Sequence, residues 1–399
     1  MTGDFSTYKI FILDLVGLKF DAQGKPDPSE VKAHIEAKGG VFHFGAWRVG
    51  DKLAQGKLHF FYLPDLSTAA EILPLTDQGQ YDGVIAAATF IPKESVFKRG
   101  GVRIGAGTGN MGSASWGGAN GVGGVAPLMN TPSFNSRATA QMVFKALLRV
   151  RPNLPVEELH ARVVAGDFDT GRNLRDYPTE KLEGKTFAVI GFGNIGAEVA
   201  QIAHVFGMRV VVFARVHHRA SIEATGFEFA ANMIDAARGA DVLSVHVGLG
   251  AFDNLKKQFA NANLIDETIL AVMNRDSVLI NYDRGELVDI AALDQALRSS
   301  RLGHAAIDAD LFKDETTGAL SGPMLPYIEL AKRYPGRLEL LPHAAADTDH
   351  PSRVAGAKQA VDQIFDCILL KRITNLKGEL PEGYVDAGAK TVVDQHNAQ

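Results

Sequence analysis

The stretch Lys185-Thr-Phe-Ala-Val-Ile-Gly191-Phe-Gly193-Asn-Ile-Gly196 decides the fold of this chain. The apolar run from Thr186 to Ile190 predicts a buried strand, and apolar residues with helical spacing continue to Phe206. A Gly-x-Gly-x-x-Gly pattern alone is a weak signal. Between a strand and a helix, it is the fingerprint of a dinucleotide-binding strand–helix–strand unit.

Each glycine of this fingerprint has its own role. Gly191 allows the tight turn, Gly193 lets the backbone approach a pyrophosphate, and Gly196 lets the helix pack closely on the strand. The amides of Asn194 and Ile195 open the helix, and a helix N-terminus attracts anions. We therefore expect these five residues to bind a dinucleotide. A glycine turn that serves packing alone is the alternative.

The end of the next strand predicts which dinucleotide is bound. This strand reads Val210-Val-Val-Phe213-Ala214-Arg215, and an NAD site usually has Asp or Glu at the position of Ala214. Arg215, with His218 and Arg219 just beyond it, offers charged donors to a 2′-phosphate. The pattern favours NADP(H) as the cofactor. A solvated basic loop beside bound NAD is the alternative.

Composition excludes several classes of protein. The chain has 399 residues, 46% of them hydrophobic and 22% charged, which is typical of a globular protein with two or three domains. A net charge of −5 does not favour nucleic acid or an anionic membrane as a partner. No apolar run reaches the roughly 20 residues of a membrane span. The single cysteine, Cys367, fits a reducing compartment, and we predict a cytoplasmic protein.

Strand and helix patterns alternate along the chain, which predicts an α/β fold with two doubly wound parallel sheets. Before the fingerprint, a helix is expected at 29–38 and strands at 8–13, 41–44, 81–88 and 102–105. After it, strands are expected at 241–247, 277–281, 304–308 and 338–341, and a helix at 351–370. We predict a first domain of 1–131, completed by 347–399, and a dinucleotide-binding domain of 132–346.

Three polar stretches follow predicted strands, at the edge where open α/β sheets bind ligands. They are Asn281-Tyr-Asp-Arg284-Gly, His304-Ala-Ala-Ile-Asp308 and Leu341-Pro342-His343. With the fingerprint and Gly105-Ala-Gly107, they resemble the D-isomer-specific 2-hydroxyacid dehydrogenase family. The resemblance implies a Rossmann-type cofactor domain, a flavodoxin-like substrate domain, and a homodimer to which the helix from Ser136 contributes.

The resemblance also implies a dehydrogenase with named catalytic residues. Arg284 would grip the carboxylate of a 2-oxo acid and polarise its carbonyl group. His343 would give a proton to the developing alkoxide. A structural arginine at the end of a strand and an ordinary surface histidine are the alternatives for these two residues.

Further residues of the family's site are carried over to this chain. Backbone amides of Ala106 and Gly107 would complete the carboxylate site. Asp308 and Tyr282 are expected beside the cofactor. The alternative for Asp308 is a residue that caps a strand end.

The chain departs from the family at the acid that pairs with the catalytic histidine. The family has a glutamate five residues after the aspartate that Asp308 matches, and this chain has Lys313 there. Asp310, Asp314 and Glu315 are the nearby acids, and we predict that Asp314 pairs with His343. No metal site is expected.

The favoured function is NADP(H)-linked reduction of a small 2-oxo acid, such as glyoxylate or hydroxypyruvate, to the D-2-hydroxy acid. Two alternatives stay open. One is an enzyme similar to NAD-dependent formate dehydrogenase. The other is a dinucleotide-sensing binding protein, similar to the corepressor branch of the family.

Overall fold

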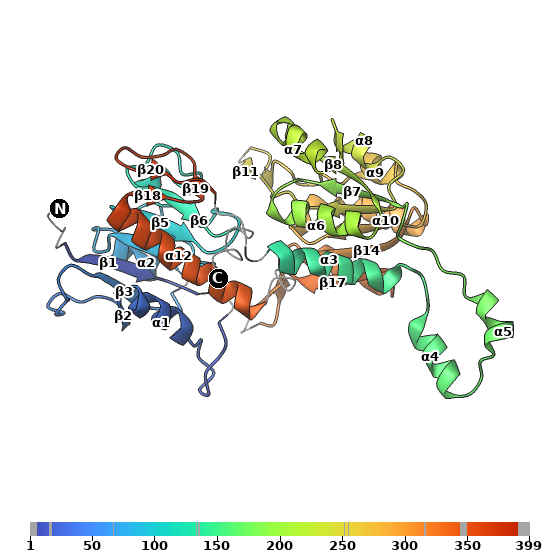
Figure 1. Ribbon diagram of the computed structural model, residues 1–399, viewed down its shortest axis with the longest axis horizontal. Coiled ribbons are helices and arrows are strands. Elements are labelled where there is room, and N and C mark those ends of the chain that lie inside the picture. Colours follow the sequence, from blue (N-terminus) through green and yellow to red (C-terminus); the bar gives the residue numbers. More distant parts are fainter. Residues whose placement is uncertain are drawn as a thin grey trace. The chain divides into compact units, whose positions relative to one another are not determined.

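The computed structural model describes residues 6–15, 18–66, 68–132, 134, 136–250, 252–253, 255–314, 317–343 and 349–389. The chain forms two compact units. Unit 1 is Met1–Asn135 with Thr348–Gln399, and unit 2 is Ser136–Asp347. Each unit contains one seven-stranded sheet flanked by helices (Figure 1). The predicted α/β fold with two parallel sheets is therefore confirmed.

The sheet of unit 1 has the order β19-β6-β5-β4-β1-β3-β2, and its neighbouring strands are parallel except β19 and β6. The elements before the chain enters unit 2 are β1 (Tyr8–Ile12), α1 (Ser29–Ala37), β2 (Val41–Phe44), β3 (Leu58–Tyr62), α2 (Ala69–Thr76), β4 (Gly83–Ala86), β5 (Gly100–Arg103), η1 (Ala114–Trp116) and β6 (Leu128–Asn130). Those after its return are α12 (His350–Phe365), η6 (Asp366–Leu370), β18 (Arg372–Ile373), β19 (Leu376–Lys377) and β20 (Val385–Asp386).

Helices cover both faces of this sheet. Val31 and Ile35 of α1 pack with Ile364 of α12 on one face. Ile72 of α2 and Trp116 pack on the other face. Strand β3 was not predicted, because all five of its residues are buried and the sequence shows no alternation that marks a strand.

The sheet of unit 2 has the order β17-β14-β13-β10-β7-β8-β9 and is parallel throughout. Its strands are β7 (Thr186–Ile190), β8 (Arg209–Phe213), β9 (Glu228–Ala230), β10 (Val242–Val245), β13 (Ser277–Asn281), β14 (Leu302–Ala309) and β17 (Leu338–Pro342). The strand order reverses between β7 and β10. Dinucleotides bind at such a switch point.

The helices of unit 2 lie in two layers. One face of the sheet packs against α3 (Ser136–Val150), α6 (Asn194–Val205) and α7 (Arg219–Ala224). The other face packs against α8 (Met233–Ala237), α9 (Glu267–Ala271), α10 (Ile290–Arg298) and α11 (Leu325–Arg333). The remaining elements of unit 2 are η2 (Leu174–Asp176), η3 (Val216–His218), η4 (Gly285–Leu287), β11 (Phe252–Asp253), β12 (Gln258–Phe259), β15 (Phe312–Lys313) and β16 (Leu320–Ser321).

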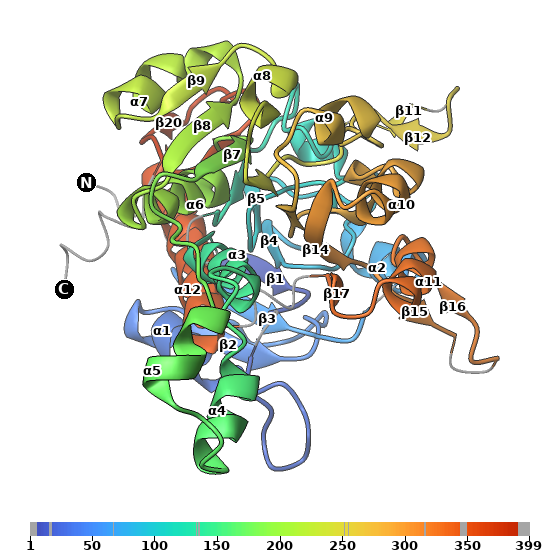
Figure 2. The same cartoon turned by 90° about the vertical axis from the view of Figure 1, so that its right-hand side faces the viewer.

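Two parts of unit 2 stand away from its sheet. Helices α4 (Val156–Val164) and α5 (Thr170–Asn173) project beyond the end of α3 and have no buried residue (Figure 1). The β15–β16 hairpin extends beside α11 (Figure 2). Within the described ranges, no helix is long and apolar enough to cross a membrane.

Candidate active site

The fingerprint turn is built for close packing at the switch point. Gly191 has φ +101°, which favours glycine, and a Cβ there would overlap the carbonyl oxygen of His246 on the adjacent chain segment. A Cβ at Gly196 would overlap the carbonyl oxygen of Gly191. At Gly193, which precedes the first turn of α6, a Cβ would meet open space. The turn therefore packs tightly at Gly191 and Gly196 and is open at Gly193, where α6 begins.

The N-terminus of α6 faces outward at this open position. Asn194 is exposed and Ile195 half-buried, as first residues of a twelve-residue helix. Amides in a first helical turn lack partners within the helix and attract phosphate. The glycine packing and this helix end fit the pyrophosphate of a dinucleotide.

The three basic residues after β8 are not equivalent. Arg219 donates to Glu223 at 2.8 Å, and its guanidinium lies 5.6 Å from the ring of Phe229. Burial and the neighbours His217 and Arg215 lower the pKa of His218, which disfavours its cationic form. Arg215 is exposed and makes no side-chain hydrogen bond or ion pair with any residue in the described ranges. Of the three, Arg215 is the one whose charge is available.

Ala214 leaves no acid beside this arginine. It is buried at the end of β8, and its side chain packs with the α3 and α6 face of the sheet. The position that usually carries a ribose-binding acid is therefore part of the core.

Tyr282 is placed differently from the prediction. Its ring is buried in the same apolar face, and its hydroxyl donates to Glu339 Oε1 at 3.2 Å. Glu339 also pairs with Arg149 of α3. Burial beside Glu339 raises the pKa of Tyr282. The side chain is therefore a core group, and only its backbone remains for a cofactor.

Three adjacent strands bring Arg284, Asp308 and His343 together. Arg284 follows β13, Asp308 lies near the end of β14 and His343 follows β17. Asp308 pairs in register with Leu341, and the His343 amide donates to the carbonyl of Ala309 at 2.9 Å. The carboxyl ends of parallel neighbours meet at one edge of the sheet, so the three side chains converge there.

The imidazole of His343 lies between a carboxylate and a guanidinium. Its Nδ1 and Asp308 Oδ1 are 2.7 Å apart, and the Asp308 side chain is 2% exposed. Its Nε2 contacts Nη1 of Arg284. Arginine only donates, so Nε2 accepts and the ring proton sits on Nδ1, where it is donated to Asp308. The Nε2 atom of this imidazole is thus directed at Arg284, the residue predicted to bind the substrate.

Asp283 is an acid at this edge that the sequence reasoning missed. It directly precedes Arg284 and is half-buried. Burial raises the pKa of Asp283 to about 6, while Arg284 and His343 oppose the rise and Asp308 adds to it. The signal in the sequence was a carboxylate next to the predicted substrate arginine.

Asp314 does not lie where it was predicted. The described chain turns at Asp314 between β15 and β16, and Asp314 Oδ1 accepts from the amide of Thr317 at 2.6 Å and from its hydroxyl at 2.8 Å. The hairpin uses this side chain to close its turn, and the structure pairs Asp308 with His343 instead. Glu315 lies outside the described residues.

The predicted carboxylate-binding turn belongs to unit 1. Ala106 and Gly107 are exposed, and their amides make no hydrogen bond to another described residue. Their neighbour Gly105 has φ +120° and donates to Thr131 Oγ1 at 2.9 Å, while Asn130 Nδ2 donates to the carbonyl of Ala106 at 2.6 Å. The bonds to Thr131 and Asn130 hold the turn in place, and the amides of Ala106 and Gly107 remain available as donors.

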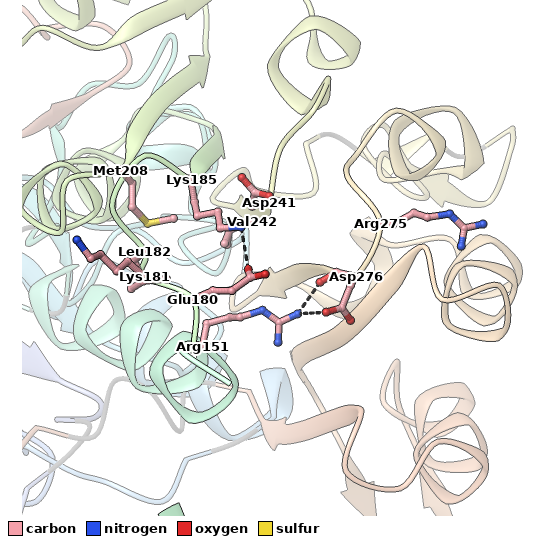
Figure 3. Close-up of a pocket in the computed structure, with 10 residues that line it drawn as sticks. All are labelled: Arg151, Glu180, Lys181, Leu182, Lys185, Met208, Asp241, Val242, Arg275 and Asp276. Atoms are coloured by element: carbon pink, nitrogen blue, oxygen red, sulfur yellow. Dashed lines mark hydrogen bonds and ion pairs between the residues drawn. The ribbon is translucent and has the colours of Figure 1, made fainter. Parts of the chain in front are cut away.

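A cavity of about 160 Å³ lies at the opposite edge of the unit 2 sheet. It is lined by residues near the starts of the strands, and two ion pairs lie within it: Arg151 with Asp276 at 2.6 Å and Lys185 with Glu180 at 2.8 Å (Figure 3). Figure 3 shows Arg275 directed away from these pairs. Because Arg151 and Lys185 are each paired with an acid of the lining, we interpret this cavity as a structural ion-pair cluster.

No group of three His, Cys, Asp or Glu side chains arranged to hold a metal occurs in the part of the chain that the structure describes.

Residues 152–330 match the family "D-isomer specific 2-hydroxyacid dehydrogenase, NAD binding domain". Residues 152–330 therefore belong to this family.

Two relatives show how far the sequence similarity extends along the chain. Glyoxylate reductase of Aeropyrum pernix is 31% identical over 59% of this chain and 64% of its own length. D-3-phosphoglycerate dehydrogenase of Methanocaldococcus jannaschii is 27% identical over 65% of this chain and 43% of its own length. The chain thus spans less than two thirds of either relative.

A solved structure extends the likeness to the fold of nearly the whole chain. An acyclic imino acid reductase, in complex with NADPH and D-Arg, matches 92% of this chain and 99% of its own chain. The TM-score is 0.61 at 19% identity. At this identity the match shows the shared fold alone.

Proposed function

We propose that this chain uses NADP(H) to reduce a small 2-oxo acid, such as glyoxylate or hydroxypyruvate, to the D-2-hydroxy acid. The observation that carries the proposal is the imidazole of His343, which is held between a buried carboxylate and a guanidinium. This arrangement lies on the same sheet edge as the dinucleotide fingerprint. The similarity to a glyoxylate reductase supports a small substrate.

Substrate binding would begin at Arg284. The guanidinium offers a planar fork of donors that matches a carboxylate. The 2-oxo group would bind where Arg284 Nη1 and His343 Nε2 meet, because both side chains can form hydrogen bonds to oxygen atoms. With the carboxylate on Arg284, the carbonyl oxygen would lie next to Nε2 of His343.

Proton transfer would then be the task of His343. A bound dihydronicotinamide supplies the hydride that adds to the carbonyl carbon. His343 would first take up a proton from solvent on Nε2. As the carbonyl electron pair moves to oxygen, His343 gives this proton to that oxygen and becomes neutral again. Asp308 accepts a hydrogen bond from the proton on Nδ1, which orients the ring and stabilises the imidazolium before transfer.

The preference for NADP(H) rests on the residues after β8. The side chain of Ala214 cannot repel a 2′-phosphate, and exposed Arg215 can donate to it. NADPH bound in the imino acid reductase of similar fold agrees with this choice.

The test is a spectrophotometric assay of NADPH and NADH oxidation with a panel of 2-oxo acids. We expect turnover with glyoxylate or hydroxypyruvate and a higher kcat/KM with NADPH than with NADH. His343→Asn should abolish turnover while dinucleotide binding persists. A preference for NADH would reject the cofactor proposal.

Two outcomes of the same assay would favour the alternatives. Formate-dependent reduction of NAD, without reduction of any oxo acid, would indicate a formate dehydrogenase. Tight dinucleotide binding without turnover of any substrate would indicate a sensor.

We also propose a homodimer. The helix from Ser136, α3, is predicted to contribute to the dimer contact. Helix α4 offers further apolar side chains, because Val156, Val163 and Val164 are exposed within unit 2. Exposed apolar side chains on an unpartnered helix favour contact with another chain. Light scattering should give twice the chain mass of 42.8 kDa, and a monomer at micromolar concentration would reject the proposal.

A further inference from the structure

A second cavity lies in unit 1, at the end of the edge strand β2, and neither the dinucleotide fingerprint nor the catalytic residues line it. Its volume is about 390 Å³. Small-molecule sites have volumes of roughly 300–1,000 Å³. The residues of its wall that carry a charge or an aromatic ring are His43, Phe44, Arg48, Asp51, Lys52 and Phe61.

Aromatic rings form one part of this wall. His43 and Phe61 are partners in the register of β2 and β3, and their rings are stacked with centroids 4.6 Å apart. His43 also stacks with the buried ring of His59, at 5.1 Å. Phe44, the last residue of β2, is 70% exposed. An aromatic ring that lines a cavity offers its face or edge to another planar group.

Hydrogen bonds fix the ring of His43. His59 Nε2 lies 3.0 Å from the carbonyl oxygen of Ala54, so this nitrogen carries a proton and donates it. In a pair of neutral rings, His59 Nδ1 then accepts from His43 Nε2, which lies 2.8 Å away. Burial and His59 lower the pKa of His43, against the opposing effect of Asp51, and thus favour the neutral ring. His43 therefore presents a fixed, uncharged aromatic surface to the cavity.

Two cations of the wall have no acidic partner. Arg48 and Lys52 are exposed, and their side chains make no hydrogen bond or ion pair with any residue in the described ranges. Asp51, the acid of the wall, closes the turn between them. Its Oδ2 accepts from the amide of Arg48 at 2.8 Å, and its own amide donates to the carbonyl of Arg48 at 3.1 Å. Positive charge therefore exceeds negative charge in this wall, unlike in the cavity at Arg151.

We propose that this cavity is a second binding site of the chain, for a small aromatic anion. The ring of the ligand packs on His43 and Phe44. Its carboxylate or phosphate group pairs with Arg48 and Lys52, because guanidinium and ammonium groups bind both kinds of anion. The site does not depend on the proposed function, since none of the catalytic residues lines it.

The test is calorimetric titration of the protein with benzoate and with phenyl phosphate, in the presence of saturating NADPH. The dinucleotide occupies the other predicted phosphate site. We expect saturable binding of at least one of the two anions with a Kd of about 1 mM or below, and the tighter ligand identifies the anionic group. The cyclohexyl analogue of that ligand, which keeps the anionic group but has no aromatic ring, should bind roughly threefold more weakly.

Matched variants assign the binding to this cavity. Arg48→Ala and Lys52→Ala should each weaken it about tenfold, because each removes one charged donor. Lys57→Ala is the control, since this exposed lysine directly precedes β3 and does not line the cavity. Fluorescence provides a local readout, because Trp47 is the neighbour of Arg48 in the chain. Its emission should change on titration of the wild type.

Three results would overturn the inference. They are no saturable binding of either anion up to about 10 mM, unchanged affinity in Arg48→Ala and Lys52→Ala, or equal binding of the aromatic and cyclohexyl ligands. The three lysine and arginine side chains are exposed, so their removal leaves the fold intact, which circular dichroism checks. Lack of turnover with every 2-oxo acid would reject the proposed function and leave the binding result standing.

Discussion

The two edges of the unit 2 sheet are both rich in charge, but they differ in how that charge is compensated. At the edge where strands begin, Arg151 pairs with Asp276 and Lys185 with Glu180 (Figure 3). At the edge where strands end, Arg284 contacts an imidazole, and Arg215 has no ion pair among the described residues.

This difference separates a structural cluster from a ligand site. The cavity of about 160 Å³ lies at the compensated edge, so a hollow with many charged residues is not by itself a functional site. A cation without a carboxylate partner keeps its capacity for an anionic ligand. The comparison therefore predicts large functional effects at one edge and small structural effects at the other.

The largest effect is expected at the acid–imidazole pair. Asp308→Asn should lower kcat for reduction by about 100-fold, because the amide cannot stabilise the imidazolium as a carboxylate does. The loss should grow with pH, and a steady-state pH profile of kcat measures it. Asp314→Asn, in the hairpin turn, should keep the wild-type profile. The reverse result would restore Asp314 as the partner of His343.

His246 should make the fold sensitive to acid. Burial lowers the pKa of His246 to about 3, against about 6.5 in an unfolded chain. The unfolded state therefore takes up the proton first, and stability that is complete above about pH 6.5 is lost progressively towards pH 3. Between pH 8 and pH 5, this loss should be about 2 kcal/mol in urea unfolding.

Two histidine variants isolate this contribution. His246→Asn should flatten the fall in stability, and His160→Asn, on the exposed face of α4, should not. Equal pH dependence in both variants would assign the acid sensitivity to other groups.

The fingerprint glycines should separate packing from ligand binding. In Gly196→Ala, the new methyl group overlaps the carbonyl of Gly191, and we expect a loss of about 1–3 kcal/mol of stability. In Gly193→Ala, the methyl group meets open space, so stability should change little while dinucleotide affinity falls. Thermal unfolding and fluorescence titration with NADPH measure the two effects. Unchanged affinity in Gly193→Ala would argue against phosphates at this turn.

Arg215→Ala should change the choice of cofactor. Loss of one charge-assisted contact should lower kcat/KM for NADPH about tenfold and leave NADH nearly unaffected. Arg219→Ala is the matched control, because that arginine already pairs with Glu223. Equal effects of the two variants would mean that the basic loop acts without a specific contact.

The smallest effect is expected at the compensated edge. Arg151→Gln should leave kcat and KM unchanged and lower stability by less than about 1 kcal/mol, as for other partly exposed ion pairs. A large change in KM would show that the cavity in Figure 3 binds a ligand.

Local patterns in the sequence determined the α/β fold, the dinucleotide turn and the polar groups that follow strands. Glycine spacing and apolar periodicity are short-range features, and parallel strands bring their carboxyl ends to one edge. This logic placed Arg284, Asp308 and His343 at that edge without knowledge of side-chain positions. It missed β3, because a fully buried strand carries no alternation.

Only the tertiary structure decided which acid serves His343. The register of β14 and β17 brings Asp308 to the imidazole, whereas a hairpin takes Asp314 into its own turn. Tertiary packing also half-buries Asp283 and raises its pKa. Pairing and burial depend on contacts between residues far apart in the chain, and sequence spacing does not record such contacts.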